Sequence, residues 1–405
     1  MPPAAMRPTD LLFAFLAAAT VCFASAAGIP LAGAGTGWDW SGWAGLHLAL
    51  LGGVSLLVIG VSQFFVTAFL ATDPPSRRMV NAQIGTWIPG SIAVVIGVAA
   101  SVDFSVVVGA VLLLTTLLFY AISLSRLRSR SLQRAPWASR WYATSAGWLV
   151  PGILIGVLLA LRVSWTDGSL LGSHLALNLA GWVGGAIVGT LHTFAPSLTQ
   201  TTLRFPSFQK ATFASWNGGV LILALGYGSG SSNLGVAGWA LLLCGACLLA
   251  ANLLASGLKA KRPLSLPARL VLLAQVFLPL ALALGLVAAL DHPLEPIFGH
   301  DRAGLAVLLL IGWVGLTVTG SMLHLLSVVV RVRDLTRPVP TPGRLWRTGI
   351  AVAALGGAGL LALAELLPLE QLIDPARLVI ALALVLLAGS VVRAVVLAFK
   401  LGHGR

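Results

Sequence analysis

The stretch HLALNLAGWVGGAIVGTLHTFAP spans residues 174–196 and contains no Asp, Glu, Lys or Arg. A helix needs about 20 mostly apolar residues to cross the hydrocarbon core of a bilayer, and this stretch is long enough. His174, Asn178 and His192 stand out in it as polar residues. Because ionisable side chains are costly inside a membrane, the two histidines mark this predicted helix, Ser169 to Phe194, as a place to look for function.

The same apolar character extends along all 405 residues, of which 58% are hydrophobic and 9% are charged. An ordinary soluble domain has roughly 25% charged residues, so the composition excludes a soluble enzyme. Breaks at proline, glycine and charge clusters predict an all-α, polytopic membrane helix bundle of about twelve spans, forming a single integral membrane domain over residues 1–405. The predicted spans are Leu11 to Ile29, Gly42 to Leu70, Ala82 to Ser101, Phe104 to Leu124, Tyr142 to Leu161, Ser169 to Phe194, Ala211 to Gly228, Leu234 to Ser256, Leu266 to Leu290, Gly304 to Val330, Thr348 to Leu367, and Ala376 to Phe399.

The net charge of +13 carries information about topology. Nucleic-acid binding needs a basic face on a soluble module, whereas here the charge lies in short loops between apolar runs. Of the 25 basic residues, 22 fall on one side of the predicted topology, and the exceptions are Arg162, Arg302 and Arg377. The positive-inside rule therefore places both termini in the cytoplasm, with the lipid bilayer as the expected partner. Frequent Ala, Leu and Val, with Arg preferred to Lys, favour a bacterial protein and hence the inner (plasma) membrane.

Two readings of the N-terminus stay open. Arg7, the apolar run Leu11 to Phe23 and the small residues that follow fit a cleavable signal peptide, but the charge count works with a retained first membrane helix, which we expect. The three cysteines lie in apolar segments and indicate no disulfide framework, and the Cys-x-x-Cys pair is expected to be small packing residues. They are Cys22, Cys244 and Cys247.

The second, sixth and tenth predicted spans share sequence. The second contains His-Leu-Ala-Leu from His47 and the sixth contains the same four residues from His174. The sixth also contains Gly-Trp-Val-Gly from Gly181, and the tenth repeats it from Gly312. Because the matches recur every fourth helix, they predict a three-fold pseudo-repeat of four helices each.

One face of the sixth span combines its polar and small residues. Asn178, Gly181, Gly185, Gly189 and His192 fall with His174 within about 60° of one face of a helix. Small residues allow close approach of another helix, or equally of a flat prosthetic group. The stripe therefore predicts either helix packing or a cofactor groove with a histidine at each end.

His47 and His174 form the best candidate pair for a metal or haem, since they enter the membrane on equivalent helices at similar depth. Neutral imidazole is the commonest side-chain metal ligand, so the pair could hold one haem iron from opposite sides. Asn178 shares the face of His174 and could orient its surroundings. His192 and His324, near the inner ends of their helices, are further candidate metal ligands, or else interfacial histidines. The remaining histidines are expected in loops or at the interface, and the outer tryptophans in the aromatic belt; they are His292, His300, His403, Trp38, Trp40 and Trp43.

These residues resemble the haem-copper oxidase subunit I and NnrS-like twelve-helix membrane families. The segment from His174 to Pro196 also resembles the membrane region of actinobacterial copper nitrite reductases. The resemblance implies haem b, copper, and electron transfer or nitric oxide chemistry, with His47 at the position of the low-spin haem ligand and His174 at a copper position. Here the seventh span has no histidine and the tenth has only His324, so oxygen reduction and proton pumping are not expected. An axial haem role for His174 is our own interpretation.

Two other functions fit the same features. About twelve spans, cytoplasmic termini and a repeat are also typical of a secondary transporter of a small solute. A structural subunit of a membrane redox complex, with vestigial histidines and no cofactor, is the third reading. Whether the chain is an enzyme is not determined by the sequence; a membrane oxidoreductase component with a redox-protein partner is the reading favoured by the histidines.

Overall fold

The computed structural model describes residues 6–33, 40–131, 137–291, 302–333, 343–367 and 369–400, and these ranges contain helices and no strand. The predicted all-α fold class is therefore confirmed. Trp38, His292, His300 and His403 lie outside the described residues. The helical elements are α1 (Pro8–Gly33), α2 (Ser41–His47), η1 (Leu48–Val54), α3 (Ser55–Leu70), α4 (Arg77–Ala99), α5 (Asp103–Ser129), α6 (Trp137–Ala160), α7 (Leu170–Leu175), η2 (Ala176–Gly184), α8 (Gly185–Thr199), α9 (Phe208–Ser229), α10 (Ser232–Gly257), α11 (Leu266–Asp291), α12 (Arg302–Ala306), η3 (Val307–Gly315), α13 (Leu316–Arg333), α14 (Arg344–Leu366), η4 (Glu370–Leu372) and α15 (Ile373–Lys400).

Each predicted span is helical. Eleven helices in the described ranges are long and apolar enough to cross a membrane, with α2, η1 and α3 joined as one of them and α7, η2 and α8 as another. The seventh predicted span is α9, which is 22 residues long but is not among the eleven. The protein is a multi-pass helical membrane protein.

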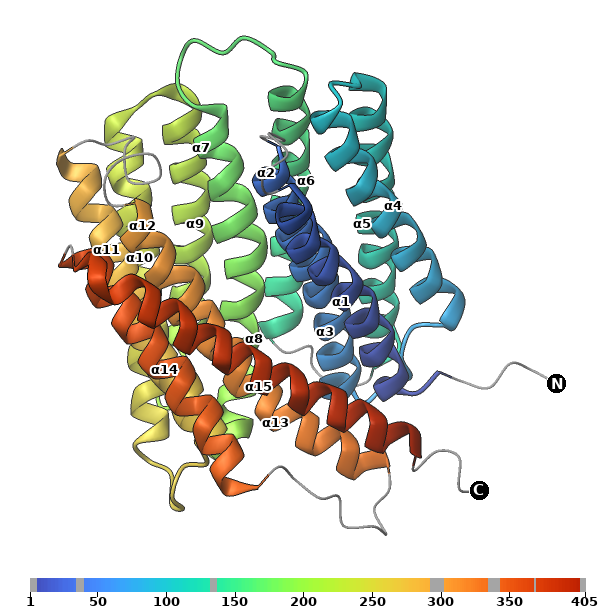
Figure 1. Ribbon diagram of the computed structural model, residues 1–405, viewed down its shortest axis with the longest axis vertical. Coiled ribbons are helices and arrows are strands. Elements are labelled where there is room, and N and C mark those ends of the chain that lie inside the picture. The colour runs from blue at the N-terminus through green and yellow to red at the C-terminus, as the bar shows by residue number, and fades with distance from the viewer. Residues whose placement is uncertain are drawn as a thin grey trace. The chain divides into compact units, whose positions relative to one another are not determined.

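The chain divides into two compact units (Figure 1). Unit 1 comprises residues 1–191 and 224–230, and unit 2 comprises residues 192–223 and 231–405. Within unit 1, α1 packs on η1 and α3, α4 packs on α5, and α6 packs on η2. Within unit 2, α10 packs on α11, α11 on α13, and α14 on α15.

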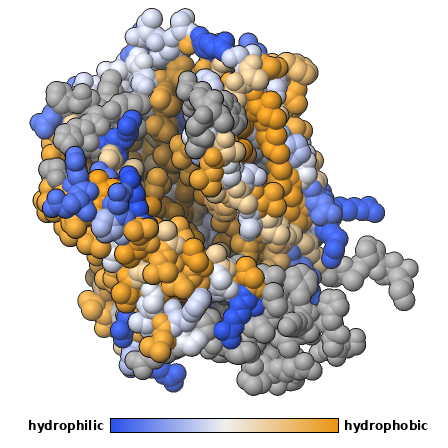
Figure 2. Space-filling view, viewed as in Figure 1, coloured by the Kyte–Doolittle hydropathy of each residue, from blue (hydrophilic) through white to orange (hydrophobic). Residues whose placement is uncertain are grey.

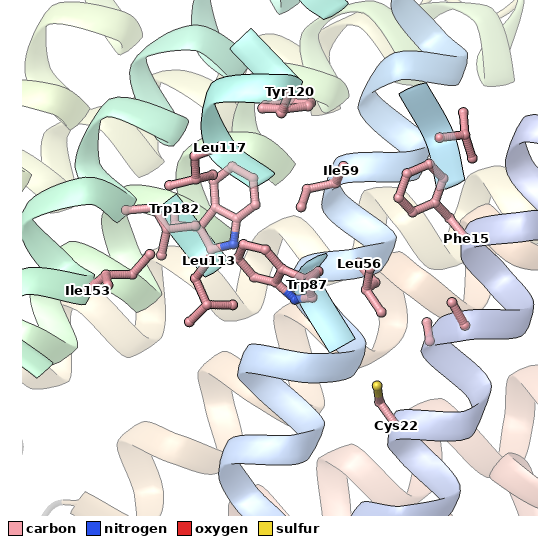
Figure 3. Close-up of a cluster of buried hydrophobic side chains, with 14 of the residues drawn as sticks. Phe15, Cys22, Leu56, Ile59, Trp87, Leu113, Leu117, Tyr120, Ile153 and Trp182 are labelled. Carbon is pink, nitrogen blue, oxygen red and sulfur yellow. The ribbon is translucent and has the colours of Figure 1, made fainter. Parts of the chain in front are cut away.

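The core of unit 1 joins its first helix to the next three spans (Figure 3). Phe15 of α1, Leu56 and Ile59 of α3, and Trp87 of α4 are all fully buried in one cluster. Glycines of the second span admit α1: a Cβ on Gly60 would overlap Phe15, and others at Gly45, Gly52 and Gly53 would meet Pro30, Cys22 and Phe23. The first helix is thus an integral part of the bundle, as expected for a membrane helix.

The outward faces of many helices are apolar (Figure 2). Phe104 on α5 is 79% exposed and Leu378 on α15 is 72% exposed. Side chains of this kind are stable when lipid covers them, so the exposed faces of these helices contact the bilayer. Cys244 and Cys247 are also on an exposed face, of α10, so the prediction that they are packing residues is wrong. Spacing alone did not reveal which face of α10 turns inward.

Several buried amides within the spans hydrogen-bond to other structural elements. The buried side chains of Gln63 and Gln83 pair reciprocally, with N to O distances of 2.9 and 3.3 Å, and Ser123 donates to Gln63 Oε1 at 2.6 Å. Asn252 of α10 binds the backbone N–H and C=O of Phe205 at 2.9 and 3.0 Å. These bonds satisfy polar groups that would otherwise be costly in a dry interior.

We predict that Gly60→Ala destabilises the protein by about 1–3 kcal/mol, because its methyl group overpacks the contact with Phe15. The matched control is Gly85→Ala on α4, where a Cβ would meet nothing within 4 Å. That change should be neutral or stabilising by up to about 1 kcal/mol, through helix propensity. Thermal unfolding in detergent, followed by circular dichroism, measures both. Equal stability of the two variants would contradict the close packing of Phe15 of α1 against Gly60.

Candidate functional site

The three spans that share sequence also share a backbone irregularity. Each contains a π-helical segment, and the described residues contain no other. The segment η1 begins one residue after His47, and η2 begins two residues after His174. Both η2 and η3 are nine residues long and end in the shared Gly-Trp-Val-Gly. Single π-helical turns are rare and occur frequently at functional sites. Both the shared sequence and the π segments therefore indicate these three spans as candidate functional regions.

The two π segments of unit 1 are linked by hydrogen bonds. The indole of Trp182, in η2, donates to the hydroxyl of Ser55 at 3.0 Å. Ser55 in turn donates to the carbonyl of Leu50 in η1, also at 3.0 Å, and Trp87 donates to the next carbonyl, of Leu51, at 2.8 Å. Carbonyls of the π turn are thus bound by Ser55 of the same span and by Trp87 of α4, and Ser55 is in turn bound by Trp182. These bonds hold the helices that carry His47 and His174 to each other.

The third π segment has the same kind of anchor, within unit 2. Trp313, in η3, donates its indole N–H to Gln275 Oε1 of α11 at 3.2 Å. Gln275 also donates to the carbonyl of Val271 at 2.8 Å. The tryptophan of the repeated Gly-Trp-Val-Gly therefore binds a buried polar side chain of a neighbouring span in both of its occurrences.

His47 is half-buried at the end of α2 and is held by Trp43, one helical turn earlier. Its Nδ1 donates to the carbonyl of Trp43 at 3.0 Å. The imidazole also stacks on the indole of Trp43, with ring centroids 3.9 Å apart and planes inclined by 30°. Trp43 thus restricts both the position and the orientation of the imidazole.

His174 is half-buried on α7 and is held by α6. Its Nδ1 lies 2.9 Å from the carbonyl of Gly152 and 3.2 Å from the side-chain nitrogen of Asn178. Nδ1 cannot donate to the carbonyl and accept from the amide at the same time. The contact with the carbonyl is shorter, and Asn178 already donates to the backbone carbonyl of His174 at 2.6 Å, so we assign the proton to Nδ1. Asn178 therefore lies beside His174, as predicted.

The two histidines share one arrangement. A carbonyl oxygen can only accept, so both imidazoles carry their proton on Nδ1 and keep a lone pair on Nε2. This is how metal-binding histidines are commonly fixed, with the other ring nitrogen donating to a backbone carbonyl. Both histidines lie in unit 1, and a charge on His47 would be felt at His174. Their pairing on one haem iron stays a prediction.

The glycine stripe of the sixth predicted span packs against a helix. A Cβ on Gly185 would lie 2.5 Å from Ser145 Oγ, and one on Gly189 would overlap Trp141, both residues of α6. Of the two readings of the stripe, helix packing is therefore the one found at these glycines, and a flat group has no room there. Any group bound at His47 and His174 must approach their Nε2 atoms instead.

Two glycines of α6 leave room for the side chains of His174 and Asn178. A Cβ on Gly156 would lie 2.9 Å from His174 Cε1, and one on Gly152 would lie 2.6 Å from Asn178 Oδ1. Sequence reasoning missed these two glycines, and also the contact of Trp43 with His47. The spacing of four residues was a usable signal for Trp43, because it places Trp43 over His47 on one helix face, whereas for the glycines it shows only that they share a face of α6.

The inner candidate ligands lie in unit 2. His192 of α8 is 2% exposed. His324 of α13 is half-buried and contacts the ring of Phe194 edge-on, with centroids 5.8 Å apart. A copper site needs about three nitrogen ligands. Within the described ranges, no three His, Cys, Asp or Glu side chains are grouped so as to hold a metal ion.

We predict that Ser55→Ala costs about 1–3 kcal/mol of stability, because it leaves Trp182 Nε1 and the Leu50 carbonyl with one partner fewer in a buried place. Thr115→Ala is the control, since that exposed hydroxyl donates to Val111 of its own helix. A double-mutant cycle with Trp182→Phe, by thermal unfolding in detergent, measures the link directly. Additive costs of the two changes would show that no such link exists.

Comparison with known proteins does not assign the chain to a family. No protein-family model matches the chain, and no curated protein matches it. The resemblance to haem-copper and NnrS-like proteins stays a prediction.

Proposed function

We propose that the protein binds haem b through His47 and His174 and serves in electron transfer or gas sensing in a respiratory or nitrogen-oxide system. One observation carries the proposal. Each imidazole donates its Nδ1–H to a backbone carbonyl, at 3.0 and 2.9 Å, and both histidines lie in unit 1. Two neutral imidazoles with Nε2 lone pairs are a suitable ligand set for one haem iron.

The residues around the pair have defined tasks in this proposal. The carbonyls of Trp43 and Gly152 fix the tautomer of each histidine and make Nε2 a better donor. Asn178 holds the backbone at His174, and the apolar spans exclude water. Haem, when bound, would supply one-electron chemistry, with its axial ligands and burial tuning the potential, and a diatomic gas would bind only by displacing one of the two histidines. Copper is the lesser expectation, because the pair offers two nitrogen ligands.

We also propose that the protein lies in the plasma membrane of a bacterium with both termini in the cytoplasm. The basic residues support this, since Arg126 and Arg128 end α5 and Arg140 lies in the first turn of α6. A C-terminal alkaline phosphatase fusion should be inactive and a C-terminal green fluorescent protein fusion should fluoresce. An active phosphatase fusion would contradict this topology.

The haem proposal predicts a b-type spectrum that depends on both histidines. The protein, purified in mild detergent from haem-supplemented cells, should give a Soret band and a positive pyridine haemochrome assay. His47→Ala and His174→Ala should each abolish the signal, because haem held by one axial ligand dissociates more readily. His192→Ala and His324→Ala are the controls and should retain it, and metal analysis of the same samples reports copper. Haem-free protein from loaded cells would overturn the proposal and favour transport or a structural role.

A substitution next to His174 tests how α6 positions its imidazole without removing a ligand. Gly156→Ala places a methyl group against the imidazole and should lower haem content. Gly147→Ala, on the same helix, is the matched control, because a Cβ there would meet nothing within 4 Å. Equal haem content in the two variants would show that α6 does not position this ligand.

A further inference from the structure

An aromatic path leads from the surface of unit 1 to His47. Trp40 immediately precedes α2 and is 43% exposed. Its ring meets that of Trp43 edge-on, with centroids 5.6 Å apart, and Trp43 stacks on His47 at 3.9 Å. Three aromatic rings are therefore in successive contact, from an exposed side chain to a candidate haem ligand.

We propose that Trp40 and Trp43 form the entry route for electrons to the haem at His47. The inference rests on the proposed haem site. One electron leaves an outer-sphere donor that is in contact with Trp40, a one-electron metal complex or a small redox protein, and the ferric iron takes it up. The donor is oxidised and the iron reduced, each by one electron, and no bond forms or breaks. The indoles supply continuous orbital contact and are not themselves oxidised.

The arrangement around Trp43 supports a path rather than a simple anchor at the interface. Interfacial tryptophans commonly direct their indole towards the lipid headgroups. The indole of Trp43 instead packs on the imidazole, and its backbone carbonyl accepts the imidazole Nδ1–H. Two independent contacts thus couple this one residue to His47. Trp40 adds the exposed ring that an external donor can reach.

Trp165 provides a matched control. It lies in the loop before α7, five residues from its start, and it is 48% exposed. Its indole donates to the carbonyl of Gly228 at 2.6 Å. It therefore offers a similar exposed indole near the start of the other histidine-bearing span, outside the stack of rings.

The contact itself can be tested without haem. In haem-free protein with ¹³C-labelled histidine, the ring-current field of Trp43 should shift the His47 ring resonances upfield. Trp43→Leu should remove this shift, and Trp165→Leu should leave it unchanged. Unshifted His47 resonances in the unaltered protein would overturn the stack and the route with it.

The route is tested by the rate of haem reduction. Haem content, Soret band and midpoint potential are measured first, and variants that match the unaltered protein are mixed with excess hexaammineruthenium(II) in a stopped-flow spectrometer. Trp40→Leu should slow reduction several-fold, Trp40→Phe should restore most of the rate, and Trp165→Leu should not change it. Equal rates for haem-loaded Trp40→Leu and the unaltered protein would overturn the route and leave the haem site standing. Absence of haem from the unaltered protein would instead overturn the proposed function, and the route falls with it.

Discussion

Carbonyl groups left over by a π-helical turn must find donors inside the protein, because the bilayer core offers none. In unit 1, the carbonyls of Leu50 and Leu51 receive bonds from Ser55 and Trp87. Ser55 also accepts from Trp182, in the second π segment. The requirement to satisfy one irregular turn therefore fixes three spans against each other, including the two that carry His47 and His174.

The need to satisfy buried polar groups also determines the hydrogen bonding of the two histidines. An imidazole in an apolar bundle is stable when it is neutral and its N–H is bonded. The carbonyls of Trp43 and Gly152 meet that need on Nδ1. In the proposed haem site, the same two bonds would also orient Nε2 towards the iron. Glycine at 156 and at 152 makes the second of these contacts sterically feasible.

The sequence predicted the parts of this arrangement that depend on composition and period. The lengths of the apolar segments located the spans. Shared four-residue motifs indicated that the second, sixth and tenth spans are equivalent. The helical period placed Asn178 beside His174, whereas the pairing of His47 with His174, inferred from depth on equivalent helices, stays a prediction. The π segments were not predicted, since η2 and η3 read as ordinary apolar helix. Gly152 and Gly156 were missed because their role depends on which helix packs against α6, which no local pattern specifies.

The third π segment shows that the π-helical backbone can occur without a neighbouring histidine. In η3 the Gly-Trp-Val-Gly and its tryptophan anchor are present, as in η2. Two residues before η3, where His174 stands relative to η2, the residue is Leu305. One residue before it, where His47 stands relative to η1, the residue is Ala306. A π turn in this protein therefore forms without a histidine beside it. The histidines of the first two repeats are therefore not required by the π-helical backbone, which leaves them available for the ligand role that we propose.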